Sequence, residues 1–123
     1  MQKWLMLLSG GVCGTAGRYV LGGAVHRWLG TEFPFGTLAV NLLGCLVIGF
    51  LSVCAERQGF SPETRLFWMV GLLGAFTTFS TLVYDSWRLL ERGELLLAGA
   101  NMMGSLLLGL AALWVGHRVA GLL

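Results

Sequence analysis

The chain has 123 residues, of which 56% are hydrophobic and only 11% are charged, with a formal net charge of +2. Soluble domains typically carry about 25% charged residues, so this composition is that of a membrane protein. The apolar stretches long enough to cross a bilayer take up most of the chain, so no residues remain for a soluble catalytic or nucleotide-binding domain. The net charge is too small to indicate nucleic acid as a partner. We predict an all-α membrane protein, a single transmembrane domain with four transmembrane helices at residues 4–28, 37–55, 66–90 and 95–115.

The first predicted span lies between Trp4 and Trp28, and tryptophan is typical of the interface between lipid and water. The segment around Cys13 also resembles the end of a signal peptide, but Arg18 follows too soon, and a retained span is the better interpretation. Arg18 lies roughly 15 Å inside the interface. Two interpretations of this residue stay open. In the structural one, its side chain extends to the membrane surface or bonds to a carbonyl at a helix end. In the functional one, it provides a positive charge beside the path of an anion.

The second and fourth predicted spans share the pattern N-x-x-G-x-x-x-x-G, which begins at Asn41 and again at Asn101. An asparagine inside a membrane helix either bonds neighbouring helices together or lines a polar track. One helical turn after each asparagine come Cys45 and Ser105, which are small and either polarisable or polar. This repetition favours a polar track, and the bonding role stays open.

The third predicted span contains the stretch G-L-L-G-A-F-T-T-F-S-T-L-V-Y-D, from Gly71 to Asp85. It puts hydroxyl groups at membrane depth, where only protein or an aqueous cavity can satisfy them. Glycine and threonine also lower helix propensity, and the hydroxyls compete for backbone partners. The residues allow either an intact helix or a helix broken mid-membrane, whose free carbonyls would face an ion.

Polar residues near the ends of the third span receive structural interpretations. Ser61, Pro62 and Glu63 are typical of a helix start, with a serine cap and a proline in the first turn. Asp85 and Arg88, at positions i and i+3, predict an ion pair at the interface rather than a proton relay.

The remaining candidate ligands indicate neither a metal site nor an enzyme. His26 and His117 each lie at a span end beside an arginine, where an interfacial role is the better interpretation. Cys13, Cys45 and Cys54 are odd in number and share no ligand spacing, so we expect neither a disulfide nor zinc. The sequence has no paired carboxylates outside the loops, no nucleophile with a base and no phosphate loop, so we do not expect an enzyme.

Positive charge differs little between the two predicted sides of the membrane. With four spans, both termini and the middle loop lie on one side of the membrane, and the other two loops lie on the opposite side. The first side carries four basic residues, Lys3, Arg57, Arg65 and Arg118. The opposite side carries Arg27 and Arg92, and Arg88 lies near the boundary. The positive-inside rule then fixes the orientation only weakly, and the chain could insert both ways round. A four-helix unit this small needs a partner to enclose a polar path, which favours an antiparallel dimer.

Four segments, in order and over essentially the whole chain, resemble the bacterial Fluc/CrcB fluoride channels: Gly14 to Arg18, Asn41 to Gly49, Gly74-Ala75-Phe76-Thr77-Thr78-Phe79-Ser80-Thr81, and Asn101 to Ser105. The resemblance implies a dual-topology dimer with two antiparallel pores. It also implies passive export of fluoride from the cytoplasm across the bacterial plasma (inner) membrane, which reduces fluoride toxicity.

By this resemblance, the backbone carbonyls of Gly74 and Thr77 would hold a structural sodium ion at the dimer interface. The fluoride pathway would be lined by Arg18, Asn41, Phe79, Ser80, Thr81, Asn101 and Ser105. Fluoride is small and strongly hydrated, so its path must replace water with amide and hydroxyl donors and the positive edges of aromatic rings. An inside-negative potential drives a monovalent anion outward by about 2.3 kcal/mol per 100 mV, so a passive channel is sufficient.

The chain departs from the family pattern at three positions. Ala75 replaces the second glycine of a pair, Leu82 replaces the second pore phenylalanine, and Asp85 replaces a glutamate. Leu82 leaves open whether the second aromatic fluoride station works, and Ala75 leaves open how sodium is held. The family includes unlike pairs in which each subunit has lost part of a pore. A homodimer is expected, and a heterodimer with a homologue stays open.

Two other functions compete with the channel at this point. The first is a small dual-topology multidrug or cation transporter, which would carry an acidic residue deep in its first span. The first span here has Arg18 and no acid, which argues against this class. The second is a membrane assembly subunit that conducts nothing, which reconstitution would reveal.

Overall fold

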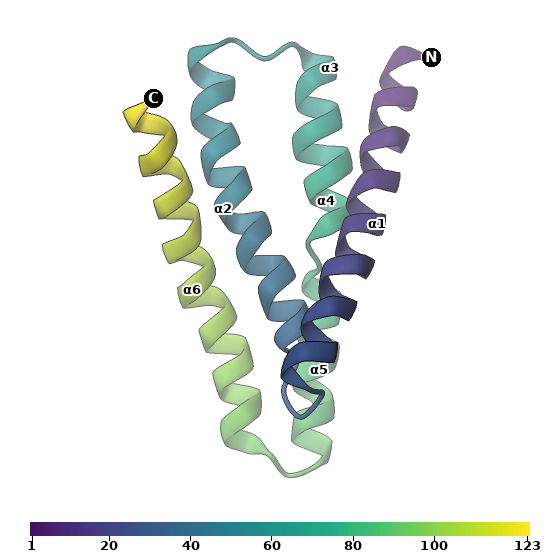
Figure 1. Ribbon diagram of the computed structural model, residues 1–123, viewed down its shortest axis with the longest axis vertical. Coiled ribbons are helices and arrows are strands. Elements are labelled where there is room, and N and C mark those ends of the chain that lie inside the picture. The colour runs from purple at the N-terminus through teal and green to yellow at the C-terminus, as the bar shows by residue number, and fades with distance from the viewer.

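Four helical rods, joined by short loops, make up the computed structural model, which describes residues 1–123 (Figure 1). Three rods are the helices α1 (Gln2–Leu29), α2 (Phe35–Arg57) and α6 (Leu95–Leu122). The remaining rod runs through α3 (Pro62–Arg65), the π-helix η1 (Leu66–Leu72), α4 (Leu73–Phe76) and α5 (Phe79–Glu91). The all-α fold with four rods is therefore confirmed.

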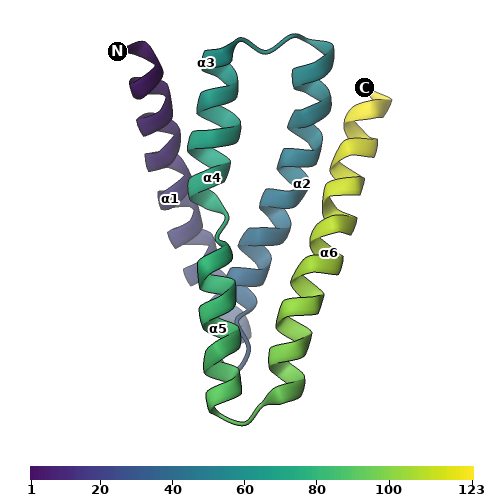
Figure 2. The ribbon, with the colours of Figure 1, turned by 180° about the vertical axis from the view of Figure 1, so that it is seen from behind.

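The rods run alternately up and down along the long axis of the molecule. Both termini and the loop between α2 and α3 lie at one end, and the loops from α1 to α2 and from α5 to α6 lie at the other (Figures 1 and 2). We call the second end the loop end. Short loops make consecutive rods antiparallel neighbours, as is usual for helix bundles.

Three of the rods are long and apolar enough to cross a membrane: α2, the rod Pro62–Glu91, and α6. α1 has 28 residues, about 42 Å at 1.5 Å per residue, but it is not among the three rods that reach this apolar content. Each predicted span falls within one rod. That α1 also crosses the bilayer stays a prediction.

The rods bury little of their apolar surface against one another, since only 21 of 123 residues are buried. Large apolar side chains such as Trp28, Leu96 and Phe79 remain exposed on the outside. Apolar surface of this extent is covered by lipid or by another protein. The outer surface of the chain therefore suits a membrane rather than water.

Close packing between α2 and α6 depends on glycine. A Cβ atom on Gly116 would meet the carbonyl oxygen of Leu46, and one on Gly49 would meet the carbonyl oxygen of Leu113. Small residues let membrane helices approach to backbone contact, where van der Waals packing stabilises them. On the other side of the molecule, Gly14 of α1 lies equally close to the backbone of η1.

The third rod begins as predicted. Ser61 Oγ accepts a hydrogen bond from the Thr64 N–H at 3.2 Å, and Pro62 occupies the first helical turn. A serine cap followed by proline satisfies one of the free N–H groups at a helix start.

We expect Gly116→Ala to destabilise the protein by about 1–3 kcal/mol, because its methyl group would push α6 away from the backbone of α2. Gly99→Ala, on the same helix, is a matched control, since no atom lies within 4 Å of the position of its Cβ. It should be neutral or slightly stabilising, because alanine has the higher helix propensity. The midpoint of thermal unfolding in detergent measures both, and equal midpoints would contradict the glycine contact.

Candidate functional site

The third rod leaves helical geometry at Thr77 and Thr78, whose backbone is extended, with φ −82° and ψ 156° at the first and φ −150° and ψ 117° at the second. Thr77 Oγ1 donates a hydrogen bond to the Leu73 carbonyl at 2.9 Å, at the end of α4. Thr78 Oγ1 accepts one from the Thr81 N–H at 3.3 Å, at the start of α5. The two threonines thus provide polar partners for both of the helix ends that they separate.

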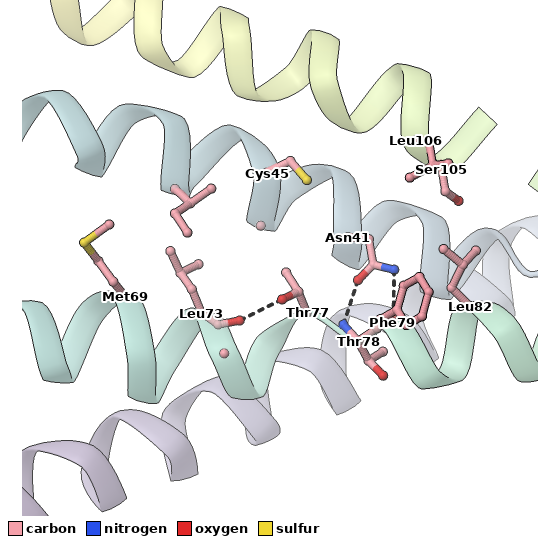
Figure 3. A pocket seen from close by; sticks show the side chains of 13 residues that line it. Asn41, Cys45, Met69, Leu73, Thr77, Thr78, Phe79, Leu82, Ser105 and Leu106 are labelled. Atoms are coloured by element: carbon pink, nitrogen blue, oxygen red, sulfur yellow. Dashed lines mark hydrogen bonds between the residues drawn. The ribbon is translucent and has the colours of Figure 1, made fainter. Parts of the chain in front are cut away.

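Asn41 of α2 binds the extended segment from the side (Figure 3). Its Nδ2 donates to the Thr78 carbonyl at 3.1 Å, and its Oδ1 accepts from the Thr78 N–H at 2.8 Å. In a continuous helix the N–H groups of Thr78 and Thr81 would donate to the carbonyls of Gly74 and Thr77. Because the Asn41 and Thr78 side chains take these N–H groups, the two carbonyls are left without their helical donors.

A cavity of about 360 Å³ lies beside this segment, between α2, α4, α5 and α6 (Figure 3). We call it the break cavity. Polar side chains on its wall include Asn41, Thr78 and Ser105, and its apolar wall includes Phe79 and Leu82. The Ser105 hydroxyl is buried and has no hydrogen-bond partner. Buried polar atoms are nearly always partnered, so this hydroxyl is available to a ligand or to water.

A second cavity, of about 310 Å³, lies between α1, α2 and α5, and most of the residues that line it have polar side chains. We call it the arginine cavity, because Arg18 lines it together with Thr37, Thr78 and Thr81. Arg18 therefore lies among hydroxyl-bearing side chains, which is compatible with both interpretations of this residue. Thr78 lies on the walls of both cavities, so the extended segment forms part of the boundary between them.

The third cavity, of about 210 Å³, lies at the loop end and is the most highly charged. We call it the loop-end cavity. Its charged lining consists of Glu32, Asp85, Arg88 and Arg92. His26 lines this cavity and the arginine cavity.

The predicted ion pair between Asp85 and Arg88 is wrong. Asp85 Oδ2 instead accepts a hydrogen bond from Thr37 Oγ1 at 2.7 Å, in the partly buried contact between α5 and α2. Arg88 is exposed, and an ion pair at an exposed position would add little free energy. A hydroxyl donor inside the protein is the better partner for this carboxylate.

The structure brings together five of the seven residues predicted for the pathway, in two adjoining cavities. Asn41, Phe79 and Ser105 line the break cavity, while Arg18 and Thr81 line the arginine cavity. Phe79 is 74% exposed, so much of its ring is not covered by the rest of the chain and faces the lipid or a neighbouring protein.

The other two predicted residues line neither cavity. Asn101 is fully buried, and its Nδ2 donates to Ser86 Oγ at 2.9 Å, which joins α6 to α5. This is the bonding role that the sequence left open for an intramembrane asparagine. Ser80 is exposed, with its hydroxyl 3.3 Å from Thr78 Oγ1.

Sequence reasoning missed three polar residues of the arginine cavity: Thr15, His26 and Thr37. Thr15 and Arg18 lie at i and i+3 and so share one face of α1, a signal that could have identified the first. Thr37 and Asp85 are 48 positions apart. No local pattern indicates such a contact.

Comparison with known proteins gives a consistent result over nearly the full length. Residues 5–117 match the family described as CrcB-like protein, Camphor Resistance (CrcB). A fluoride-specific ion channel FluC of Nitratidesulfovibrio vulgaris is 45% identical over 117 residues, which cover 94% of each chain. A protein of the same name from Thermus thermophilus is 43% identical over 100% of this chain and 98% of its own length. Another, from Nitrobacter winogradskyi, is 41% identical over 96% of this chain and 97% of its own length.

We expect Asn41→Ala to destabilise the protein by about 2–4 kcal/mol, because it leaves both backbone groups of Thr78 without a partner. Ser105→Ala is a matched control in the same cavity, since its hydroxyl has no partner to lose. Thermal unfolding in detergent gives the stability, and hydrogen exchange of the segment 73–81 locates the change. Unaltered exchange in Asn41→Ala would show that the asparagine does not hold the extended segment.

Proposed function

Because the chain belongs to the CrcB-like family, whose matched relatives are fluoride-specific ion channels, we propose that it conducts fluoride passively out of the bacterial cytoplasm and so reduces fluoride toxicity. It is a multi-pass protein of the bacterial plasma membrane. The match over nearly the full chain favours a channel over a multidrug transporter or a non-conducting subunit.

The break cavity is the observation that supports this function from within the chain. Fluoride must exchange its hydration water for hydrogen-bond donors. The unpartnered Ser105 hydroxyl is one. The Asn41 amide is another, since only one of its two N–H groups need be used on Thr78. The edge of the Phe79 ring adds positive potential without a full charge.

The two helix ends at the extended segment favour opposite charges. α5 begins at Phe79, so its positive end lies at the break cavity and favours an anion. α4 ends at Phe76, with the unbonded carbonyls of Gly74 and Thr77 close by, and carbonyls at a helix end favour a cation. Fluoride and a positive ion thus have separate places at one discontinuity.

The sodium ion expected from the family fits these residues. The carbonyl oxygens of Gly74 and Thr77 would hold it, because they lack helical donors and are the oxygen ligands that such ions prefer in broken helices. No group of three or more His, Cys, Asp or Glu side chains offers an alternative site. When bound, sodium supplies positive charge that offsets the converging carbonyl dipoles. Ala75 adds one methyl group beside them.

We propose that two copies assemble antiparallel in the membrane, as a dual-topology homodimer. Phe79 and Gly74 are both exposed on the single chain. No atom lies within 4 Å of the position of a Cβ on Gly74, so a second backbone has room to approach. A partner there would cover the Phe79 ring and complete a wall for the fluoride path. A homologue in place of the second copy would give a heterodimer.

We expect the purified chain alone, reconstituted in liposomes with sodium, to release fluoride down its gradient and to reject chloride by a large factor. A fluoride-selective electrode measures the release, and protein-free liposomes measure the leak. Equal passage of the two anions, or no passage with sodium on both sides, would contradict a self-sufficient fluoride channel. Activity restored only by a co-expressed homologue would indicate the heterodimer.

Leu82 is buried and lines the break cavity beside Phe79. We expect Leu82→Phe to leave fluoride release equal or faster, because it adds an aromatic edge in a cavity with room for a ring. Leu106→Phe is the matched control, since it adds the same ring on the α6 side of the cavity. Loss of release in Leu82→Phe would show that this pore is adapted to leucine, and equal changes in both variants would indicate an effect of volume alone.

A further inference from the structure

His26 is the one residue that lines both the loop-end cavity and the arginine cavity. We propose that its imidazole is a fluoride-binding group at the boundary between these cavities, which passes the anion toward Arg18 and makes conduction increase when the ring is protonated. This inference rests on the proposed fluoride conduction and adds to it a residue outside the predicted pathway.

The imidazole ring is held by packing and has a free nitrogen. A Cβ atom on Gly36, in the first turn of α2, would lie 2.7 Å from His26 Nε2 and 2.8 Å from Cδ2, so this edge of the ring rests on the glycine. On the other edge, Nδ1 is buried and has no hydrogen-bond partner. Because buried polar atoms are nearly always partnered, this nitrogen requires a ligand or a water molecule.

Few other donors at this boundary are free to bind an anion. The Thr37 hydroxyl has a single proton, and it donates that proton to Asp85 at 2.7 Å. The Asp85 carboxylate repels fluoride where the loop-end cavity adjoins the arginine cavity. Arg88 and Arg92 line only the loop-end cavity, so on the arginine-cavity side of Asp85 the cationic or protonatable donors that can attract the anion are the guanidinium of Arg18 and the ring of His26. A protonated imidazole gives the stronger, charge-assisted hydrogen bond.

The surroundings of His26 contain charges of both signs. The titratable or charged side chains that share the two cavities with it are Arg18, Tyr19, Glu32, Asp85, Arg88 and Arg92. Protonation of His26 adds a positive charge near Asp85 and raises the local concentration of fluoride. Histidine is the side chain whose ordinary titration falls between about pH 5 and 8, so current should rise as pH falls through this range.

Electrical recording tests this proposal. The fluoride current through planar bilayers that contain the protein is measured at constant fluoride concentration, at pH values from about 8 to 5.5, a range that spans ordinary histidine titration. Neutral hydrogen fluoride carries no current and so does not interfere. As the pH is lowered, the wild-type current should rise up to about tenfold. The variant His26→Gln should show no rise, because glutamine keeps an N–H donor but cannot gain a proton. His117→Gln is the matched control, since the other histidine is exposed in the last turns of α6, whose C-terminus lies at the end of the molecule opposite the loop end (Figure 1). A wild-type current that does not rise, or a rise that persists in His26→Gln, would overturn the proposal.

A binding measurement that needs no conduction separates this proposal from the channel function. In NMR spectra of the wild-type protein in detergent at constant pH, added fluoride should shift the resonances of the His26 imidazole ring, because the anion binds beside it. The His117 ring should not respond, and chloride should have less effect on His26. A fluoride-dependent shift in a protein that passes no current would support His26 binding while refuting the channel. A current without any shift would overturn the role of His26 and leave the channel intact.

Discussion

The hydrogen bonds between Asn41 and the backbone of Thr78 determine the geometry of the whole site. They take the N–H group that would continue the helix and hold Thr78 in extended conformation. As a result α5 begins as a separate helix at Phe79, and the Gly74 carbonyl lacks the N–H donor that a continuous helix would provide. The same segment separates the break cavity from the arginine cavity. One side-chain amide thus determines where the helical backbone of the third rod stops and where it begins again.

Much of this arrangement follows from local sequence, and the rest depends on contacts between distant segments. Thr77 and Thr78 combine low helix propensity with hydroxyls that bond to backbone, and their torsions are extended. The cap at Ser61 is equally local, and it was predicted correctly. The partner of Asp85 could not be predicted, because Thr37 reaches it only after α2 packs on α5. Asn101 shows the same limit, because its amide bonds Ser86 on another helix.

The three cavities have different electrostatic environments. Charged side chains surround the loop-end cavity, hydroxyls and one guanidinium surround the arginine cavity, and the break cavity has polar groups on a largely apolar wall. Full charges therefore become fewer with distance from the loop end. Donors without a full charge bind an anion less tightly than charged donors do, so the three cavities differ in how strongly they would hold one.

The backbone contacts that glycine permits between α2 and α6 have a mechanical consequence for the break cavity. At Gly49 and Gly116 no side chain that could change rotamer separates the two backbones, and protein interiors packed this tightly are hardly compressible. Asn41 and Ser105 lie on these two helices, so the backbone contacts restrict how far apart the residues that carry the two donors can move. The wall that α2 and α6 contribute to the break cavity therefore resists expansion when an ion or a water molecule enters.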